Sequence, residues 1–188
     1  MARGAAAMLL LAALLSAPAA QAERDLAAQA ACLAKQLRKH GGPEGGRASA
    51  LKMHFECFPA DPERFVALFD LNPGATGVLA ADHAAHLELF FAARPAAGER
   101  AWSTKAVAVL AGGAWREGPV DLFADLLAMQ MEARAPALLD AAGKLDDAAL
   151  ASFWRALFGG AAGFTPDASV CAGRETLRAC AALATLAR

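Results

Sequence analysis

The sequence predicts an all-α fold, and three observations support this. Alanine and leucine are abundant, whereas isoleucine and tyrosine are absent and valine is scarce. The abundant residues favour helices, and the missing ones favour β-strands. Apolar residues recur at helical spacing between breaks of glycine and proline. We therefore expect an irregular array of about seven or eight short helices rather than a long four-helix bundle.

The first 22 residues have the pattern of a cleaved export signal. Arg3 supplies a basic start, an apolar run follows over residues 5–15, and an A-x-A motif ends at Ala22. The run is shorter than the ~20 apolar residues that a membrane-spanning helix needs, so we expect no stable span after cleavage. Cleavage after Ala22 leaves Glu23 as the first residue, and residues 23–188 are long enough for a single helical domain.

Helix signals follow one another along residues 23–188. Asp61 and Asp146 are predicted N-caps, and Pro62 and Pro119 suit the first turn of a helix. Glycine pairs, and prolines at 73, 95 and 136, end or interrupt the apolar patterns. The expected helices cover residues 24–40, 48–56, 62 to before 72, 81–93, 100–110, 119–134, 136–142 and 147–158, followed by a cysteine-containing helical tail over 166–186.

Four cysteines remain after the predicted cleavage, and an even number in an exported chain favours two disulfides. Three pairings are possible, of which we expect the local one, Cys32 with Cys57 and Cys171 with Cys180. One straight helix from 171 to 180 would hold the second pair about 13 Å apart, too far for a bond. The chain must therefore turn between them, and Gly173 is the expected place.

Several short motifs between residues 57 and 160 resemble a loose group of exported bacterial helical proteins with no known activity. The residues that carry the resemblance are Cys57-Phe58-Pro59, Phe65, Leu68-Phe69, Leu89-Phe90-Phe91, Gly112-Gly113-Ala114-Trp115 and Ser152-Phe153-Trp154. They span a little over half of the chain. The resemblance implies a helical domain and no activity. Residues 161–163 depart from the polar, proline-containing stretch expected there.

Two histidines, His83 and His86, are three residues apart, and this spacing on a helix can place two imidazoles on one face. A metal site needs at least one further ligand, which His54, His40 or a carboxylate would have to supply. Solvent-facing or capping histidines explain the same pattern. The sequence thus leaves a metal site of His83, His86 and His54 as one hypothesis.

Large aromatic residues beside a glycine turn suggest an interaction surface. Gly112 and Gly113 precede Trp115, and Trp154 follows Phe153 on a predicted helix. Such residues can line an apolar groove for a partner. Helix packing is the alternative that we favour, because Phe153 and Trp154 also fit a buried helix face.

The charge balance and the motifs exclude some classes of function. The chain carries a net charge of -1, so there is no basic surplus for a nucleic acid. We find no nucleophile-elbow, zinc-protease or catalytic cysteine–histidine motif. We therefore predict a periplasmic or secreted binding protein without a cofactor, whose partner is a protein of the cell envelope. It would act as an adaptor, or as an inhibitor or immunity-type protein. A metal-binding protein and an unrecognised hydrolase, with acids at 121, 125, 132, 146 and 147, are the alternatives.

Overall fold

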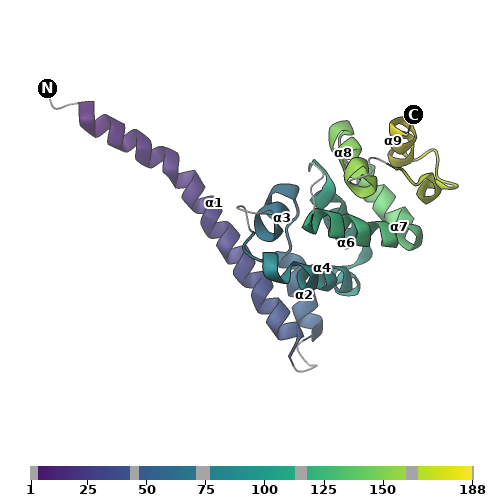
Figure 1. Ribbon diagram of the computed structural model, residues 1–188, viewed down its shortest axis with the longest axis horizontal. Helices are drawn as coiled ribbons and strands as arrows, with labels where there is room; N and C mark the ends of the chain where they lie inside the picture. The colour runs from purple at the N-terminus through teal and green to yellow at the C-terminus, as the bar shows by residue number, and fades with distance from the viewer. Residues whose placement is uncertain (1–3, 43–46, 71–76, 113–117, 160–164, 188) are drawn as a thin grey trace.

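The chain folds as an array of helices of unequal length (Figure 1). This computed structural model describes residues 4–42, 47–70, 77–112, 118–159 and 165–187, and those residues form helices and no strand. The predicted all-α class is therefore confirmed. The elements are α1 (Gly4–His40), α2 (Arg47–Cys57), α3 (Pro62–Phe69), the 3-10 turn η2 (Ala80–Asp82), α4 (His83–Ala92), α5 (Arg94–Ala97), α6 (Glu99–Leu110), α7 (Pro119–Ala142), α8 (Asp147–Phe158), the 3-10 turn η3 (Ala168–Cys171) and α9 (Arg178–Leu186).

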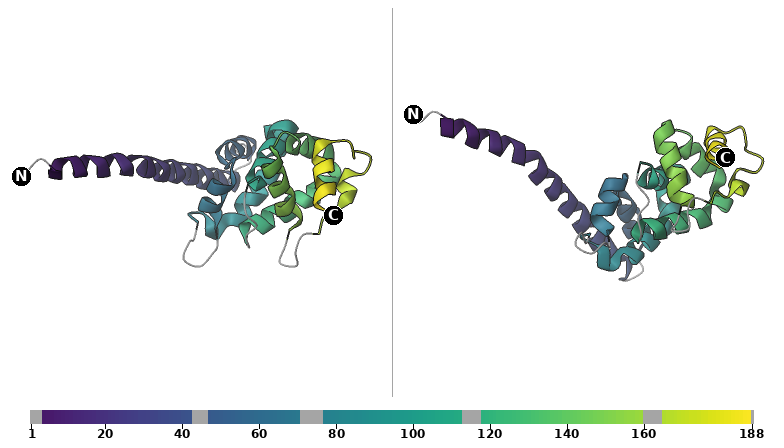
Figure 2. Two further views of the ribbon diagram at one scale, coloured as in Figure 1. Left: turned by 90° about the horizontal axis from the view of Figure 1, so that it is seen from above. Right: turned by 45° about the horizontal axis from the view of Figure 1, so that its top comes forward.

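Helix α1 begins well before the expected residue 24, so residues 4–22 of the predicted leader and the cleavage point lie inside one continuous helix. Its N-terminal half projects away from the other helices, whereas its C-terminal half lies beside α2 (Figures 1 and 2). Residues 21–25 are exposed, and the first core residue of α1 is Ala30, which is 4% exposed. Among the residues whose side chains the structure describes, no helix is long and apolar enough to cross a membrane.

The predicted N-caps are confirmed at the starts of two helices. Asp61 Oδ1 accepts a hydrogen bond from the Arg64 amide at 2.8 Å, at the start of α3. Asp146 Oδ1 accepts one from the Ala149 amide, also at 2.8 Å, at the start of α8. Each bond satisfies an amide that the helix itself leaves without a partner.

The predicted helix break at Pro136 is wrong, because α7 runs through this proline without interruption. Pro136 is exposed, and buried residues on both sides of it, Met131, Ala135 and Leu138 among them, lie on one continuous face. Burial of that face outweighs the hydrogen bond that proline cannot make. The connection between the helices expected over 81–93 and 100–110 is also shorter than predicted, because residues 94–97 form α5, with Pro95 in its first turn.

Aromatic rings fill the core between α2, α3, α4 and α7. Phe58 lies at the centre, with its ring centroid 4.2 Å from that of Phe90 and 5.8 Å from that of Phe69. Trp102 of α6 is fully buried, and its Nε1 donates to the Phe90 carbonyl oxygen at 3.1 Å. This cluster fixes α4 against the end of α2, where the polar groups described below lie.

The two disulfides pair as predicted, Cys32 with Cys57 and Cys171 with Cys180. The first joins α1 to the end of α2. The second closes a loop near the C-terminus, in which Gly173 has φ +72°, a value that favours glycine and that turns the chain as expected.

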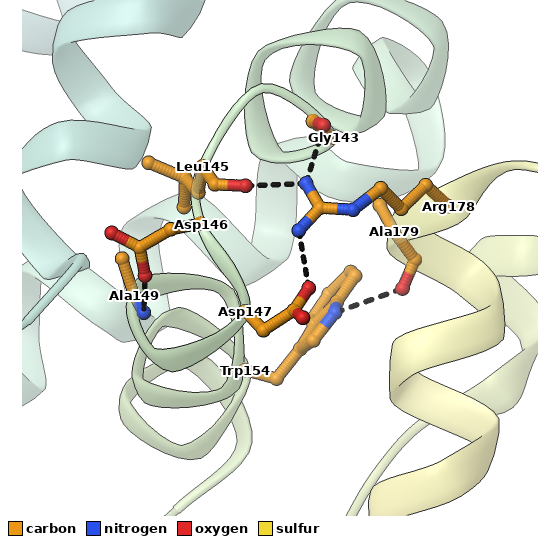
Figure 3. A network of polar contacts seen from close by, with 8 residues as sticks. All are labelled: Gly143, Leu145, Asp146, Asp147, Ala149, Trp154, Arg178 and Ala179. Carbon is orange, nitrogen blue, oxygen red and sulfur yellow. Dashed lines mark hydrogen bonds and ion pairs between the residues drawn. The ribbon is translucent and has the colours of Figure 1, made fainter.

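Hydrogen bonds from Arg178 attach α9 to the turn between α7 and α8 (Figure 3). Its guanidinium donates to the carbonyl oxygens of Gly143 and Leu145 and pairs with the Asp147 carboxylate. Beside it, Trp154 Nε1 donates to the Ala179 carbonyl oxygen at 3.0 Å. The C-terminal tail is thus held by a disulfide within it and by these polar contacts to the helices beneath.

Candidate functional site

A pair of histidines lies in the core where α2 meets α4. His54 and His86 are both 0% exposed, and His54 Nε2 lies 3.1 Å from His86 Nδ1, within hydrogen-bond distance. Their rings are stacked, with centroids 5.4 Å apart and planes 15° apart. Phe58 and Phe69 border the pair, so its surroundings are largely apolar.

This environment favours the neutral form of both imidazoles. The pKa of His54 is lowered to about 3, chiefly by burial, and the charges of His86, His40 and Lys105 contribute to this shift. Burial also lowers the pKa of His86, although Asp82 acts in the opposite direction. The outer nitrogens, His54 Nδ1 and His86 Nε2, have no hydrogen-bond partner among the described residues. The pair is therefore a neutral donor and acceptor in an apolar site.

His83, the third histidine of the metal hypothesis, does not join this pair. It is half-buried at the start of α4, and its Nδ1 lies 2.9 Å from the Ala80 carbonyl oxygen. Within the described part of the chain, no three side chains of His, Cys, Asp or Glu come together as a metal site requires. Of the three predicted ligands, the structure thus brings together His54 and His86.

A shallow apolar groove runs along α6, on the surface near the end of α2. Its volume is about 920 Å³. Five of the ten lining residues are alanine or glycine, and Phe55 adds an aromatic wall. The lining residues are Phe55, Ala60, Ala97, Gly98, Glu99, Arg100, Ala101, Thr104, Lys105 and Ala108. The small side chains let the backbone of another segment approach α6 closely.

Positive charge gathers at the end of this groove where α5 meets α6. Glu99 accepts a hydrogen bond from Arg94 at 2.9 Å and lies 3.8 Å from Arg134 of α7. Arg100 is exposed, and among the described residues it attracts the Asp140 carboxylate without a hydrogen bond. Asp140 is also paired with Lys144. Among the described side chains, three guanidinium groups and Lys144 therefore outnumber the carboxylates of Glu99 and Asp140.

Lys105 lies between the groove and the end of α2. Its Nζ donates to the carbonyl oxygens of Phe55 at 2.6 Å, Phe58 at 3.0 Å and Glu56 at 3.4 Å. It also lies 4.4 Å from the centre of the Phe55 ring. Burial lowers the pKa of this ammonium, and Glu56 opposes the shift. Lys105 therefore caps α2 and donates to carbonyl groups at its C-terminal end, one of which, that of Phe55, also accepts from the Phe58 amide.

The predicted aromatic surface is described only in part. Trp154 is fully buried and donates to Ala179, so packing, the favoured alternative, accounts for it. Gly112 is exposed, with φ +83°. Gly113 and Trp115 lie outside the described residues.

Four of the five acids of the hydrolase hypothesis have separate places in the structure, and the side chain of the fifth, Glu132, lies outside the described part. Asp146 caps α8, and Asp147 pairs with Arg178. Asp121 lies in the first turn of α7, where a negative charge suits the helix dipole, and Asp125 is exposed on the same helix.

Sequence reasoning missed the groove and the capping role of Lys105. Ala97, Ala101 and Ala108 have the spacing of one helix face, but in a chain so rich in alanine this signal does not stand out. Lys105 is about 50 residues from the carbonyl groups that it caps, and no local pattern could have linked them.

Comparison of the chain with protein-family models, with curated protein sequences and with solved structures gives no match.

Proposed function

We propose that the protein is an exported, disulfide-bonded helical module that binds another protein of the cell envelope. It would act as an adaptor, or as an inhibitor or immunity-type protein. The observation that carries this proposal is the shallow groove along α6. An open, apolar surface lined by small side chains suits another polypeptide better than a small substrate, which needs an enclosed pocket.

The cysteines and the N-terminal pattern support the proposed location. All four cysteines are paired, and such bonds persist in oxidising compartments. Among the described side chains, the packing of α1 against the core begins at Leu26, after the predicted cleavage point. Removal of residues 1–22 would therefore leave these described core contacts in place.

Site-directed photo-crosslinking in cells tests this function. A photoreactive amino acid replaces Ala101 in the groove or, as the control, Ala148, an exposed alanine on α8. We expect one discrete protein adduct from position 101 and none from position 148. Equal adducts from both positions, or none from either, would contradict a binding role for this surface.

A metal-binding protein is the second candidate, and the approach of His54 to His86 is what favours it. Native mass spectrometry of the protein purified without chelators tests it. A stoichiometric metal that is lost in the His54→Ala/His86→Ala double variant and kept in His40→Ala would support this candidate. A metal-free wild-type protein would eliminate it.

A further inference from the structure

We propose that the groove along α6 binds a helical segment of the partner that carries an apolar face and carboxylates near one end. This inference rests on the proposed binding function and names the chemistry of the partner.

The shape of the groove suits a helix. Ala101, Thr104 and Ala108 lie along α6, and the span from Ala101 to Ala108 is about 10 Å at a helical rise. About two turns of a partner helix would cover this length. Side chains as small as alanine allow two helix backbones to approach closely, with larger apolar groups of the partner packing against Phe55.

The charge at the end of the groove selects carboxylates. Glu99 accepts a hydrogen bond from Arg94 and forms an ion pair with Arg134. With Arg100 and Lys144, these cations outnumber the carboxylates of Glu99 and Asp140 among the described side chains. The Nε atom of Arg134 is buried and lacks a hydrogen-bond partner among the described residues. Arginine favours carboxylates because its planar group can donate two parallel hydrogen bonds.

Arg100 is the residue best placed to make the new contact. It lines the groove and is exposed, and among the described residues its guanidinium attracts Asp140 without making a hydrogen bond. Lys105, in contrast, already donates to three carbonyl oxygens. We therefore assign the recognition of the carboxylates to Arg100, with Arg94 and Arg134 adding to the attraction.

Fluorescence anisotropy with two designed peptides tests the inference on the full chain with both disulfides formed. The probes are amphipathic helices of Ala and Leu about 15 residues long. One carries glutamates at one end, and the other carries glutamines at the same positions. We expect saturable binding of the glutamate peptide, weakened by added salt, and at least roughly tenfold weaker binding of the glutamine peptide.

Four variants locate the binding. Ala101→Trp fills the groove and should abolish binding, whereas Ala148→Trp on α8 should leave it unchanged. Arg100→Ala should weaken binding of the glutamate peptide about two- to fivefold, as expected for one exposed ionic contact. Arg155→Ala removes another exposed arginine, one on α8 outside the groove, and should have no effect.

The outcomes separate this inference from the proposed function. Equal binding of both peptides, or binding that Ala101→Trp leaves unchanged, overturns the inference. If neither peptide binds while photo-crosslinking at position 101 still captures a protein, the binding function stands and the acidic helical partner is wrong. A crosslinked adduct that proves to be a second copy of this chain likewise overturns the inference.

Discussion

His54 and His86 share one hydrogen bond, 3.1 Å long, between two side chains that water does not reach. One nitrogen of the facing pair must donate and the other accept. Protonation of both rings would place two donors against each other and two charges among aromatic rings. The contact between α2 and α4 thus depends on the protonation state of these two imidazoles, which changes with the pH of the solvent.

We expect acid to destabilise the fold through this pair. A histidine whose pKa is lowered in the folded state gives stability that is complete above the unfolded pKa of about 6.5 and is lost as the pH falls towards the folded value. With the pKa of His54 at about 3, lowering the pH from 7 to 4.5 should cost about 2.5 kcal/mol. His86 acts in the same direction. The free energy of unfolding in urea at the two pH values measures this.

The His54→Leu/His86→Leu double variant should lose most of this acid dependence, because both titrating groups are gone. His83→Gln is the matched control and should keep it, since His83 lies outside the pair. Parallel loss of stability in the wild type and the double variant would assign the acid sensitivity to other groups.

The Lys105→Met variant should destabilise the domain by about 1–3 kcal/mol, because three carbonyl oxygens at the end of α2 lose their donor. Methionine keeps most of the apolar stem that packs on Phe55. Urea unfolding at pH 7 measures the loss. Lys52→Met removes an exposed lysine from the same helix and should change stability little. If both variants behave alike, Lys105 does not cap α2.

Gly77→Ala should destabilise the domain by about 1–3 kcal/mol. A Cβ at this position would lie 2.5 Å from the Leu68 carbonyl oxygen and 2.6 Å from the Asp70 nitrogen. The backbone cannot yield there, because the Gly77 amide donates to the Asp70 carbonyl oxygen. Gly41→Ala, where the nearest atom is 3.7 Å away, is the control. Thermal unfolding of both variants decides this, and equal melting temperatures would show that the chain at residue 77 can move aside.

The Arg178→Lys variant should loosen α9 without unfolding the rest of the domain. Lysine keeps the charge but cannot reach Gly143, Leu145 and Asp147 together. We expect faster hydrogen exchange of the α9 amides, with little change in α4 and α6. Arg174→Lys serves as the control, because Arg174 bonds to the nearby Ala172 carbonyl oxygen. Unchanged exchange in α9 would mean that the disulfide and Trp154 suffice to hold it.

Local patterns predicted much of the fold. The helical class, the caps at Asp61 and Asp146 and the turn at Gly173 all depend on residues close together in the sequence. The break predicted at Pro136 was wrong because tertiary burial on both sides outweighs a local preference.

The candidate sites were harder to predict, because they join distant segments. His54 and His86 were named as possible metal ligands, but their direct contact across 32 residues has no sequence signal. The charge around Glu99 likewise depends on Arg134, which belongs to a different helix. The sequence showed these side chains but not which of them meet.

The order of the disulfides along the chain affects how the protein can be oxidised. The first cysteine is bonded to the second and the third to the fourth, with separations of 25 and 9 residues. The two disulfide loops therefore do not overlap along the chain. A chain that emerges N-terminus first presents Cys32 and Cys57 long before Cys171. Oxidation in order of appearance therefore yields the native pairs, so a dithiol oxidase is sufficient and no isomerase is needed to correct a mispaired bond.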